Sequence, residues 1–146
     1  MCKQITDNDN DFSIKIRVYY EDTDSGGVVY YANYLKFMER SRTEWLRSLG
    51  FEQDQLINEL QTIFAVRSAQ AEYYRPAKFN DLLQVTATIK EMKRSNITFQ
   101  QQVTRKKQDG STELLVEGTI KIVSVNTINF KPKKIPDQLM EHLNGH

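Results

Sequence analysis

An acidic residue followed by two glycines is the feature of this sequence best suited to chemistry. Residues 22–31 read DTDSGGVVYY, in which Asp24 stands two positions before Gly26 and Gly27. Two adjacent glycines allow the backbone to come close to a ligand. If a helix begins shortly afterwards, its first N–H groups have no partner and carry partial positive charge. A carboxylate beside such donors can attack a carbonyl group or activate water, while the N–H groups hold a developing oxyanion.

The same residues also have structural interpretations. An Asp in a turn before a helix is more often a cap than a catalyst. Asp22 is expected to bond to the backbone of the turn. The carboxylates of Asp22 and Asp24 could bind Mg²⁺, which prefers hard oxygen ligands, but two acids are a weak signal for a metal site. On the residues alone, these interpretations all stay open.

The periodicity of apolar residues predicts a strand before this segment and a helix after it. Apolar residues alternate with polar ones over residues 13–20, which predicts a strand. Over residues 34–49, apolar residues recur at three- and four-residue steps, as on one face of an amphipathic helix. Gly50 is a favourable end for this helix. The acidic, glycine-containing segment therefore joins a strand to a helix.

The remainder of the chain favours antiparallel strands. Residues 51–61 are connecting residues that leave room for a short helical turn. Strands are predicted over about residues 62–74, 85–90, 97–103 and 114–125, with a short helix in the tail. Asp109 and Gly110 form a strong hairpin signal. One long helix must cover one face of this sheet, which predicts an α+β fold. Because that helix cannot also cover the other face and the edge of the sheet, we expect a dimer.

Composition and charge exclude several classes of protein. The 146 residues carry a net charge of +1, which gives no overall field for attracting nucleic acid or an anionic membrane. The longest apolar run covers residues 28–32, far short of the roughly 20 residues that span a membrane. The single cysteine, Cys2, excludes an internal disulfide and a cysteine-rich zinc site. We therefore expect one cytoplasmic domain over residues 1–146, with a loose leader at 1–12 and a basic tail at 131–146.

Residues 18–50, from VYYEDTDSGG to EWLRSLG, closely resemble the hotdog-fold acyl-CoA thioesterases of the 4-hydroxybenzoyl-CoA thioesterase (4HBT) superfamily. They look most like its Tol-Pal-associated (YbgC) type. Residues 73–77 followed by Asp81, and residues 89–95, are similar to later strands and turns of the family, so the resemblance covers about residues 13–125. It implies an antiparallel sheet of about five strands wrapped around one long central helix. It also implies homodimers or homotetramers with active sites between subunits.

The resemblance implies roles for several residues of the acidic motif. Asp24 is implied to be catalytic, either as a nucleophile that gives a mixed anhydride or as the base for water. The backbone N–H group of Tyr31 is implied to polarise the thioester carbonyl group. Gly26, Gly27 and Val28 are implied to lie against the substrate.

Tyr31 is a departure from this type, whose members usually have His at the same position. The unperturbed pKa of Tyr is about 10, so its side chain cannot replace an imidazole as acid or base near neutral pH. If His is needed for the chemistry, its loss predicts a slower enzyme or a changed substrate range. If only the backbone N–H group is needed, little changes. We favour the second interpretation, because aromatic members of the superfamily have Tyr here, and we expect Tyr31 to line the acyl pocket.

Two basic clusters are candidates for binding phosphate groups. Lys93 and Arg94 match the turn that holds the coenzyme A phosphates in the superfamily, and their cationic side chains suit that task. A solvated turn is an equally good interpretation of this pair. Lys131, Lys133 and Lys134 could reach coenzyme A or an acidic acyl carrier protein, although a solvated tail is favoured.

The resemblance predicts an acyl-CoA thioesterase that hydrolyses a thioester to a free acid and coenzyme A, without a metal or redox cofactor. The alternative is a non-catalytic hotdog protein that binds acyl-CoA or acyl carrier protein, which the departure at Tyr31 keeps open. A hotdog dehydratase is disfavoured, because it would need a His in the site and both His residues, His142 and His146, lie in the tail. Glu39, on the predicted helix, is expected to be a surface charge.

Overall fold

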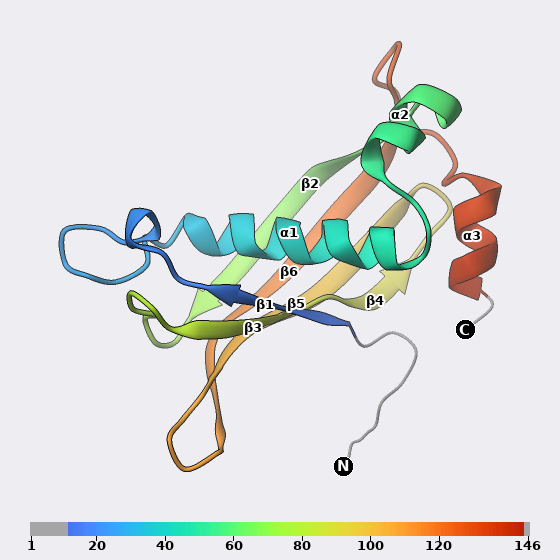
Figure 1. Cartoon of the computed structure of the whole chain (residues 1–146). Coiled ribbons are helices and arrows are strands. Elements are labelled where there is room, and N and C mark those ends of the chain that lie inside the picture. The colour runs from blue at the N-terminus through green and yellow to red at the C-terminus, as the bar shows by residue number, and fades with distance from the viewer. Residues whose placement is uncertain (1–11, 145–146) are drawn as a thin grey trace.

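The computed structural model describes residues 12–144, so Cys2 and His146 lie outside the described residues (Figure 1). The strands and helices, in chain order, are β1 (Ser13–Arg17), the 3₁₀ turn η1 (Tyr20–Asp22), α1 (Asn33–Ser48), α2 (Gln53–Leu60), β2 (Thr62–Tyr73), β3 (Leu82–Thr86), β4 (Thr88–Met92), β5 (Asn96–Lys106), β6 (Thr112–Asn126) and α3 (Asp137–Asn144). None of these described helices combines the length and the apolar character needed to cross a membrane.

The strands form one six-stranded antiparallel sheet in the order β1-β3-β5-β6-β2, and β4 also pairs with β5. This arrangement confirms the predicted α+β class. The hairpin between β5 and β6 contains Gly110, whose φ of 88° favours glycine, as the Asp109–Gly110 signal predicted. β2 lies at one edge of the sheet, and most of its residues are exposed.

Some elements differ from those predicted. β1 ends early, at Arg17, because the N–H and carbonyl groups of Val18 bond to the loop before β3 instead of to a strand. The strand predicted around residues 85–90 is divided into β3 and β4 at Ala87, whose N–H group donates to the carbonyl of Phe12. The connection after α1, where the sequence left room for a short helical turn, contains the eight-residue helix α2.

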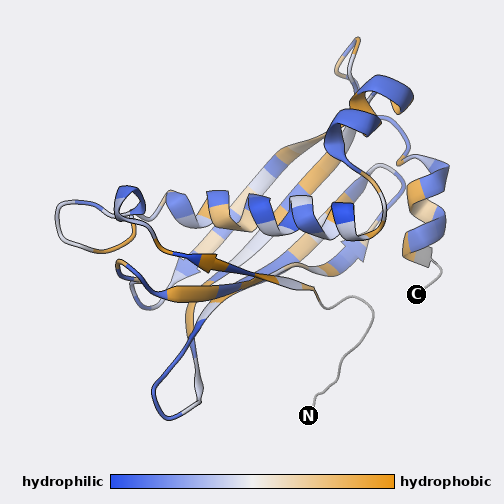
Figure 2. Cartoon of the chain, viewed as in Figure 1, coloured by the Kyte–Doolittle hydropathy of each residue, from blue (hydrophilic) through white to orange (hydrophobic). Residues whose placement is uncertain are grey.

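α1 lies across one face of the sheet and buries the apolar stripe that the sequence predicted (Figure 1). The residues buried along it are Tyr34, Phe37, Met38, Ser41, Trp45 and Leu46. The helix ends at Ser48, and Gly50 follows with a φ of 95°. Figure 2 shows apolar segments recurring in the strands behind α1, whereas the outer part of the β5–β6 hairpin is hydrophilic.

Gly118 in β6 allows α1 to come close to the sheet. A Cβ atom added there would lie 2.8 Å from Sδ and 2.9 Å from Cε of Met38. Met38 is fully buried, so displacing its side chain disturbs the core around it. Gly118 is therefore required by the close approach of the helix.

Gly118→Ala is expected to lower the free energy of unfolding by about 1–3 kcal/mol, the usual effect of overpacking a core. Chemical denaturation would measure this loss. In the double variant with Met38→Ala, the added methyl group can enter the space that Met38 leaves, so the combined loss should be smaller than the sum of the two. Simple additivity would show that the two side chains do not compete for the same space.

Gln101 in β5 connects α1 to the sheet by polar contacts inside the core. Its side chain is fully buried. Nε2 donates to the carbonyl oxygens of Met38 at 3.0 Å and Thr86 at 2.9 Å, and Oε1 accepts a hydrogen bond from Nη1 of Arg42 at 2.9 Å. Burial lowers the pKa of the Arg42 guanidinium. Gln101 therefore joins the middle of α1 to the carbonyl that ends β3.

Candidate active site

Asp24 lies in a tight turn between η1 and α1. Thr23 and Val29 form an isolated antiparallel bridge that closes this turn. Inside it, the N–H group of Asp24 donates to the carbonyl of Val28 at 2.9 Å, and the N–H group of Gly27 donates to the carbonyl of Asp24 at 3.0 Å. The φ of Gly27 is 82°, which explains glycine at this position. The turn presents Asp24 as an exposed residue.

The Asp24 carboxylate uses one oxygen to support the turn. Oδ1 accepts a hydrogen bond from the N–H group of Gly26 at 2.8 Å, and a Cβ atom at Gly26 would lie 3.2 Å from that oxygen. The N-cap residue of α1 is Ala32, so the interpretation of Asp24 as a helix cap is wrong. Within residues 12–144, no donor bonds to Oδ2, which leaves this oxygen available to a ligand.

Asp22 has the structural role predicted for it. Its Oδ2 accepts a hydrogen bond from the N–H group of Tyr19 at 2.9 Å. Its carbonyl oxygen accepts from Nδ2 of Asn33 at 2.9 Å and from the N–H group of Tyr30 at 3.2 Å. Asn33, which was not expected to have a role from the sequence, begins α1 and joins the helix to η1. An Asn at a helix start signals a side chain–backbone bond, but the sequence does not identify its partner.

Tyr31 lies two residues before α1, where an unpaired backbone donor is expected. In the part of the chain that the structure describes, its N–H group donates to no acceptor. Its carbonyl oxygen accepts from the N–H group of Tyr34 at 3.3 Å, which fixes the direction of the peptide. The side chain of Tyr31 is 61% exposed. The Tyr31 N–H group is therefore a fixed donor that a ligand can use.

A small cavity with aromatic walls lies beside Tyr31. Its volume is about 240 Å³, and its lining residues are Val29, Tyr31, Tyr34, Tyr73, Tyr74, Arg75 and Pro76. The ring centroid of Tyr73 lies 6.1 Å from that of Tyr31 and 5.7 Å from that of Tyr34. Burial raises the pKa of Tyr34 and of Tyr73, so both phenols stay uncharged at neutral pH. The cavity therefore offers uncharged aromatic surface next to the candidate oxyanion donor.

Within one chain, the predicted basic residues Lys93 and Arg94 do not lie beside Asp24. They occupy the turn between β4 and β5, towards the other end of α1 (Figure 1). Trp45, near the end of α1, contacts Phe99 in β5 with ring centroids 5.1 Å apart. The helix rises by about 18 Å between its first residue and Trp45. Within one chain, the carboxylate and this basic turn therefore lie towards opposite ends of α1.

The two basic clusters lie together towards the Trp45 end of α1. The N–H group of Ile135 donates to the carbonyl of Arg94 at 2.9 Å, which holds the segment with Lys131, Lys133 and Lys134 against the β4–β5 turn. Nζ of Lys133 donates to a carbonyl at the end of α2 at 2.9 Å, and Nζ of Lys134 pairs with a carboxylate of α3 at 2.8 Å. Arg94 and Lys131 are exposed. The result is a basic surface built from two segments.

The remaining candidates lie elsewhere on the surface. Glu39 is exposed on α1, as predicted, and His142 is exposed on α3. Among residues 12–144, no three or more His, Cys, Asp or Glu side chains are grouped so that they could hold a metal ion.

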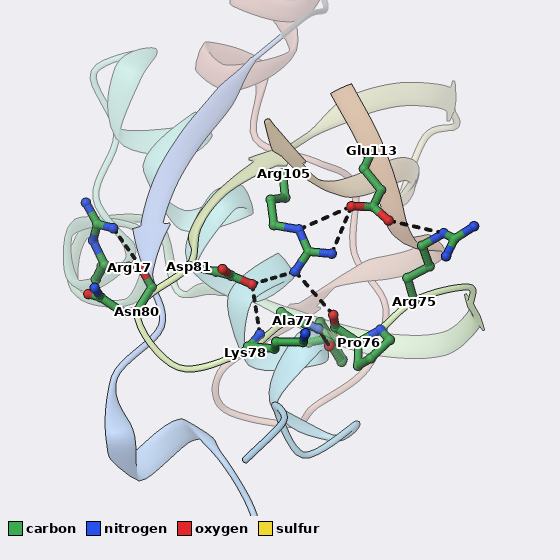
Figure 3. A network of polar contacts seen from close by, with 10 residues as sticks. Arg17, Arg75, Pro76, Ala77, Lys78, Asn80, Asp81, Arg105 and Glu113 are labelled. Carbon is green, nitrogen blue, oxygen red and sulfur yellow. Dashed lines mark hydrogen bonds and ion pairs between the residues drawn. The ribbon is translucent and has the colours of Figure 1, made fainter. Parts of the chain in front are cut away.

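An ion-pair cluster that was not expected from the sequence lies against residues 75–81 (Figure 3). We call it the Arg105 cluster, and its members are Arg75, Asp81, Arg105 and Glu113. Nη1 of Arg105 lies 2.6 Å from Oδ2 of Asp81, and Nη2 lies 2.9 Å from Oε1 of Glu113. Nε of Arg75 lies 3.1 Å from Oε2 of Glu113. The opposite charges of Arg105 and Glu113 flank the predicted hairpin and were a usable signal, but nothing local connects Asp81 to them.

The hydrogen bond from Arg105 lowers the pKa of the Glu113 carboxyl. Because the folded value is lower than the unfolded value, the pair stabilises the fold above the ordinary pKa of about 4.3, and this contribution disappears as the pH falls through the lowered value. Wild type should exceed Glu113→Gln in stability by a constant amount between about pH 6 and 8, and by less and less below about pH 5. Urea denaturation at a series of pH values measures this difference. A difference that is equal at pH 3 and pH 7 would contradict the ion pair.

Comparisons with known proteins identify the family to which this chain is similar. Residues 26–112 match the family model described as the thioesterase superfamily (4HBT). The acyl-CoA thioesterase YbgC of Haemophilus influenzae is 44% identical over 131 residues, which cover 90% of this chain and 93% of that protein. The crystal structure of a probable thioesterase from Bartonella henselae superposes with a TM-score of 0.79 at 31% identity, covering 86% of this chain and 99% of that one.

The 4-hydroxybenzoyl CoA thioesterase of a Pseudomonas species has a TM-score of 0.83 at 20% identity, covering 91% of this chain and 99% of that one, which shows the likeness of fold. These structures confirm the predicted hotdog fold. The family model covers more than half of the chain, and the Haemophilus relative matches nearly all of it. The chain therefore belongs to the thioesterase superfamily.

Proposed function

We propose that this chain is an acyl-CoA thioesterase in which Asp24 drives the attack on the thioester and the Tyr31 N–H group stabilises the oxyanion. One observation carries the proposal. Within residues 12–144, the Tyr31 N–H group has no acceptor and Oδ2 of Asp24 has no donor, although both belong to the same short connection between η1 and α1. The names of the relatives, such as acyl-CoA thioesterase YbgC, support the same activity.

The reaction can follow two routes with the same overall balance. In the general-base route, Asp24 takes a proton from water while the water oxygen bonds to the thioester carbon, and the Tyr31 N–H group stabilises the charge on the carbonyl oxygen. The C–S bond then breaks, and the proton held by Asp24 passes to the coenzyme A thiolate. In the nucleophilic route, the Asp24 carboxylate bonds to the carbon itself, and the C–S bond breaks to release the coenzyme A thiolate. Water then hydrolyses the mixed anhydride, which frees Asp24 and supplies the proton that the thiolate takes. Each route consumes one water, yields one acid and one thiol, and needs no metal or redox cofactor.

We propose a homodimer that forms through the edge of the sheet. Along β2, Ile63 is 37% exposed and Val66 is 53% exposed, which is unusual for apolar residues on a long edge strand. Antiparallel pairing of two β2 strands around a two-fold axis would cover this edge. Because paired strands then run in opposite directions, the Thr62 end of one copy would lie beside the Tyr73 end of the other.

This pairing would complete the site with the basic surface of the second copy. Ser95, next to Lys93 and Arg94, accepts the N–H group of Ser124 in β6, close to the place where β6 pairs with Thr62. The aromatic cavity lies at the Tyr73 end of the same strand. The basic turn of one copy would therefore approach the active site of the other, where its cations suit the phosphates of coenzyme A.

The activity is tested by following thiol release, with a disulfide dye, from acyl-CoAs ranging from acetyl to palmitoyl, together with 4-hydroxybenzoyl-CoA. We expect turnover on at least one of them. Absence of release from every acyl-CoA would contradict the hydrolase. Calorimetric binding of an acyl-CoA or an acylated carrier protein without release would then support the binding protein that the sequence left open at Tyr31.

The shared site is tested with two defective chains. Asp24→Asn removes the carboxylate, and the double variant Lys93→Glu/Arg94→Glu removes the basic turn. In a co-refolded equimolar mixture, half of the dimers are mixed, and each mixed dimer has one intact site, so activity at low substrate concentration should return to about a quarter of wild type. A mixture as inactive as its two components would show that each site lies within one chain.

A further inference from the structure

We infer that Arg105 is a positioning residue for this active site: its guanidinium fixes residues 75–81, and these residues hold the loop that carries the oxyanion donor. The inference rests on the proposed function for its kinetic consequence, but its structural part stands on contacts alone. No polar contact joins Arg105 to Asp24 or Tyr31, so we expect its effect on turnover to pass through residues 75–81.

Arg105 contacts the connection from β2 to β3. Nη1 of Arg105 donates to Oδ2 of Asp81 at 2.6 Å and reaches the carbonyl oxygen of Pro76 at 3.4 Å. The same Oδ2 of Asp81 accepts the N–H group of Lys78 at 2.9 Å. At the other side, Glu113 joins Arg105 to Arg75. One guanidinium therefore holds both ends of residues 75–81 (Figure 3).

This connection in turn contacts the active-site loop. Ala77 is fully buried at the middle of residues 75–81. Its carbonyl oxygen accepts the N–H group of Val29 at 2.8 Å, and its N–H group donates to the hydroxyl oxygen of Tyr34 at 2.9 Å. Val28 and Lys78 form a further antiparallel bridge. A shift of residue 77 must therefore move the backbone two residues before Tyr31 and the first turn of α1.

The chemistry of the cluster explains why the residue is arginine. Three acceptors lie in different directions around the group: Asp81, Glu113 and the Pro76 carbonyl. A planar guanidinium carries five N–H donors in a fixed arrangement and can meet all three, whereas the single ammonium of a lysine acts as a point charge. The side chain of Arg105 is only 20% exposed, so water does not easily replace the lost contacts.

Loss of the Arg105 contacts is expected to slow turnover by disturbing the alignment of Asp24 and the Tyr31 N–H group. The reacting carboxylate and the oxyanion donor must meet the thioester in a defined geometry, and a misplacement of about 1 Å can lower the rate by about 100-fold. We therefore expect Arg105→Gln to lower kcat by about 10- to 100-fold and to change KM much less. Arg105→Lys, which keeps the charge but not the directions of the donors, should fall in the same range.

The test combines steady-state kinetics with hydrogen exchange of single amides. In Arg105→Gln, the amides of Val29 and Ala77 should exchange at least about 10-fold faster than in wild type, while amides in the middle of β6 keep their protection. Arg47→Gln is the matched control, because Arg47 also joins two carboxylates, Glu44 and Glu52, but at the far end of α1. It should leave both kcat and these exchange rates unchanged.

Several results would overturn the inference. Wild-type exchange at Val29 and Ala77 in Arg105→Gln would refute it, and so would an unchanged kcat in that variant. If Arg105→Gln does not fold, Glu113→Gln leaves the bond from Arg105 to Asp81 in place and should show the same changes in smaller measure. If wild type hydrolyses no acyl-CoA, the proposed function fails, but the exchange rates still decide whether Arg105 positions the loop.

Discussion

Asp24→Asn is expected to lower kcat for thioester hydrolysis by about 100- to 10,000-fold, with a much smaller change in KM. Asn has nearly the same size as Asp, and its side-chain oxygen can still accept the Gly26 N–H group that Oδ1 of Asp24 accepts at 2.8 Å. The turn should therefore keep its shape while the charge that takes a proton or attacks the carbon is lost. Thiol release at saturating concentrations of the best acyl-CoA measures the effect.

Asp109→Asn provides a control with the same chemistry and the same local geometry. Oδ1 of Asp109 accepts the N–H group of Ser111, two residues later, at 2.9 Å, just as Asp24 does with Gly26. Asp109 lies in the protruding β5–β6 hairpin, so its replacement should keep kcat within about twofold of wild type. Equal losses in the two variants, or a wild-type kcat in Asp24→Asn, would contradict the catalytic assignment.

Gln101→Leu is expected to lower the free energy of unfolding by about 3 kcal/mol. Leu fits the volume of the site but offers no polar atom, so the carbonyl of Thr86 and a guanidinium N–H of Arg42 lose their partner where water has little access. The penalty comes mainly from these unpaired groups rather than from the lost hydrogen bonds themselves. Urea denaturation followed by tryptophan fluorescence suits the measurement, because Trp45 is buried in the same helix.

Gln84→Leu is the matched control for this substitution. Gln84 is exposed on β3 and bonds to the hydroxyl of Ser13 at 2.9 Å. Its replacement should change the stability by no more than about 0.5 kcal/mol. Similar losses in both variants would mean that the buried contacts of Gln101 with α1 stabilise the fold no more than the exposed contact of Gln84 does.

The shape of the loop around Asp24 could be predicted because its properties are local. The order of strand, turn and helix around Asp24 follows from residue periodicity and from two glycines, one of which adopts a positive φ. The free N–H group of Tyr31 follows from its place before a helix start. Each of these features depends on residues within about ten positions of one another in the sequence.

The contacts that position the loop could not be predicted in this way. The bond between Ala77 and Val29 and the ion pair between Asp81 and Arg105 join segments that only the folded sheet brings together. Val18 shows the same effect on an element boundary, because the loop before β3 takes its hydrogen bonds and ends β1 early. Local periodicity predicts which face of a helix or strand is buried, but it does not predict which loop will pack against that face.

Gly118 and Gln101 act on the same residue of α1, Met38, one through its side chain and the other through its carbonyl oxygen. Both contacts therefore hold the middle of α1 close to the sheet. On the proposed function, a change of acyl preference would therefore not come easily from a shifted helix. The exposed rim of the aromatic cavity is the place where we expect it, because Tyr31 and Tyr74 are exposed there and can be exchanged with little effect on the core. Selection for new substrates can thus proceed at this rim while the folding stability of the protein stays largely untouched.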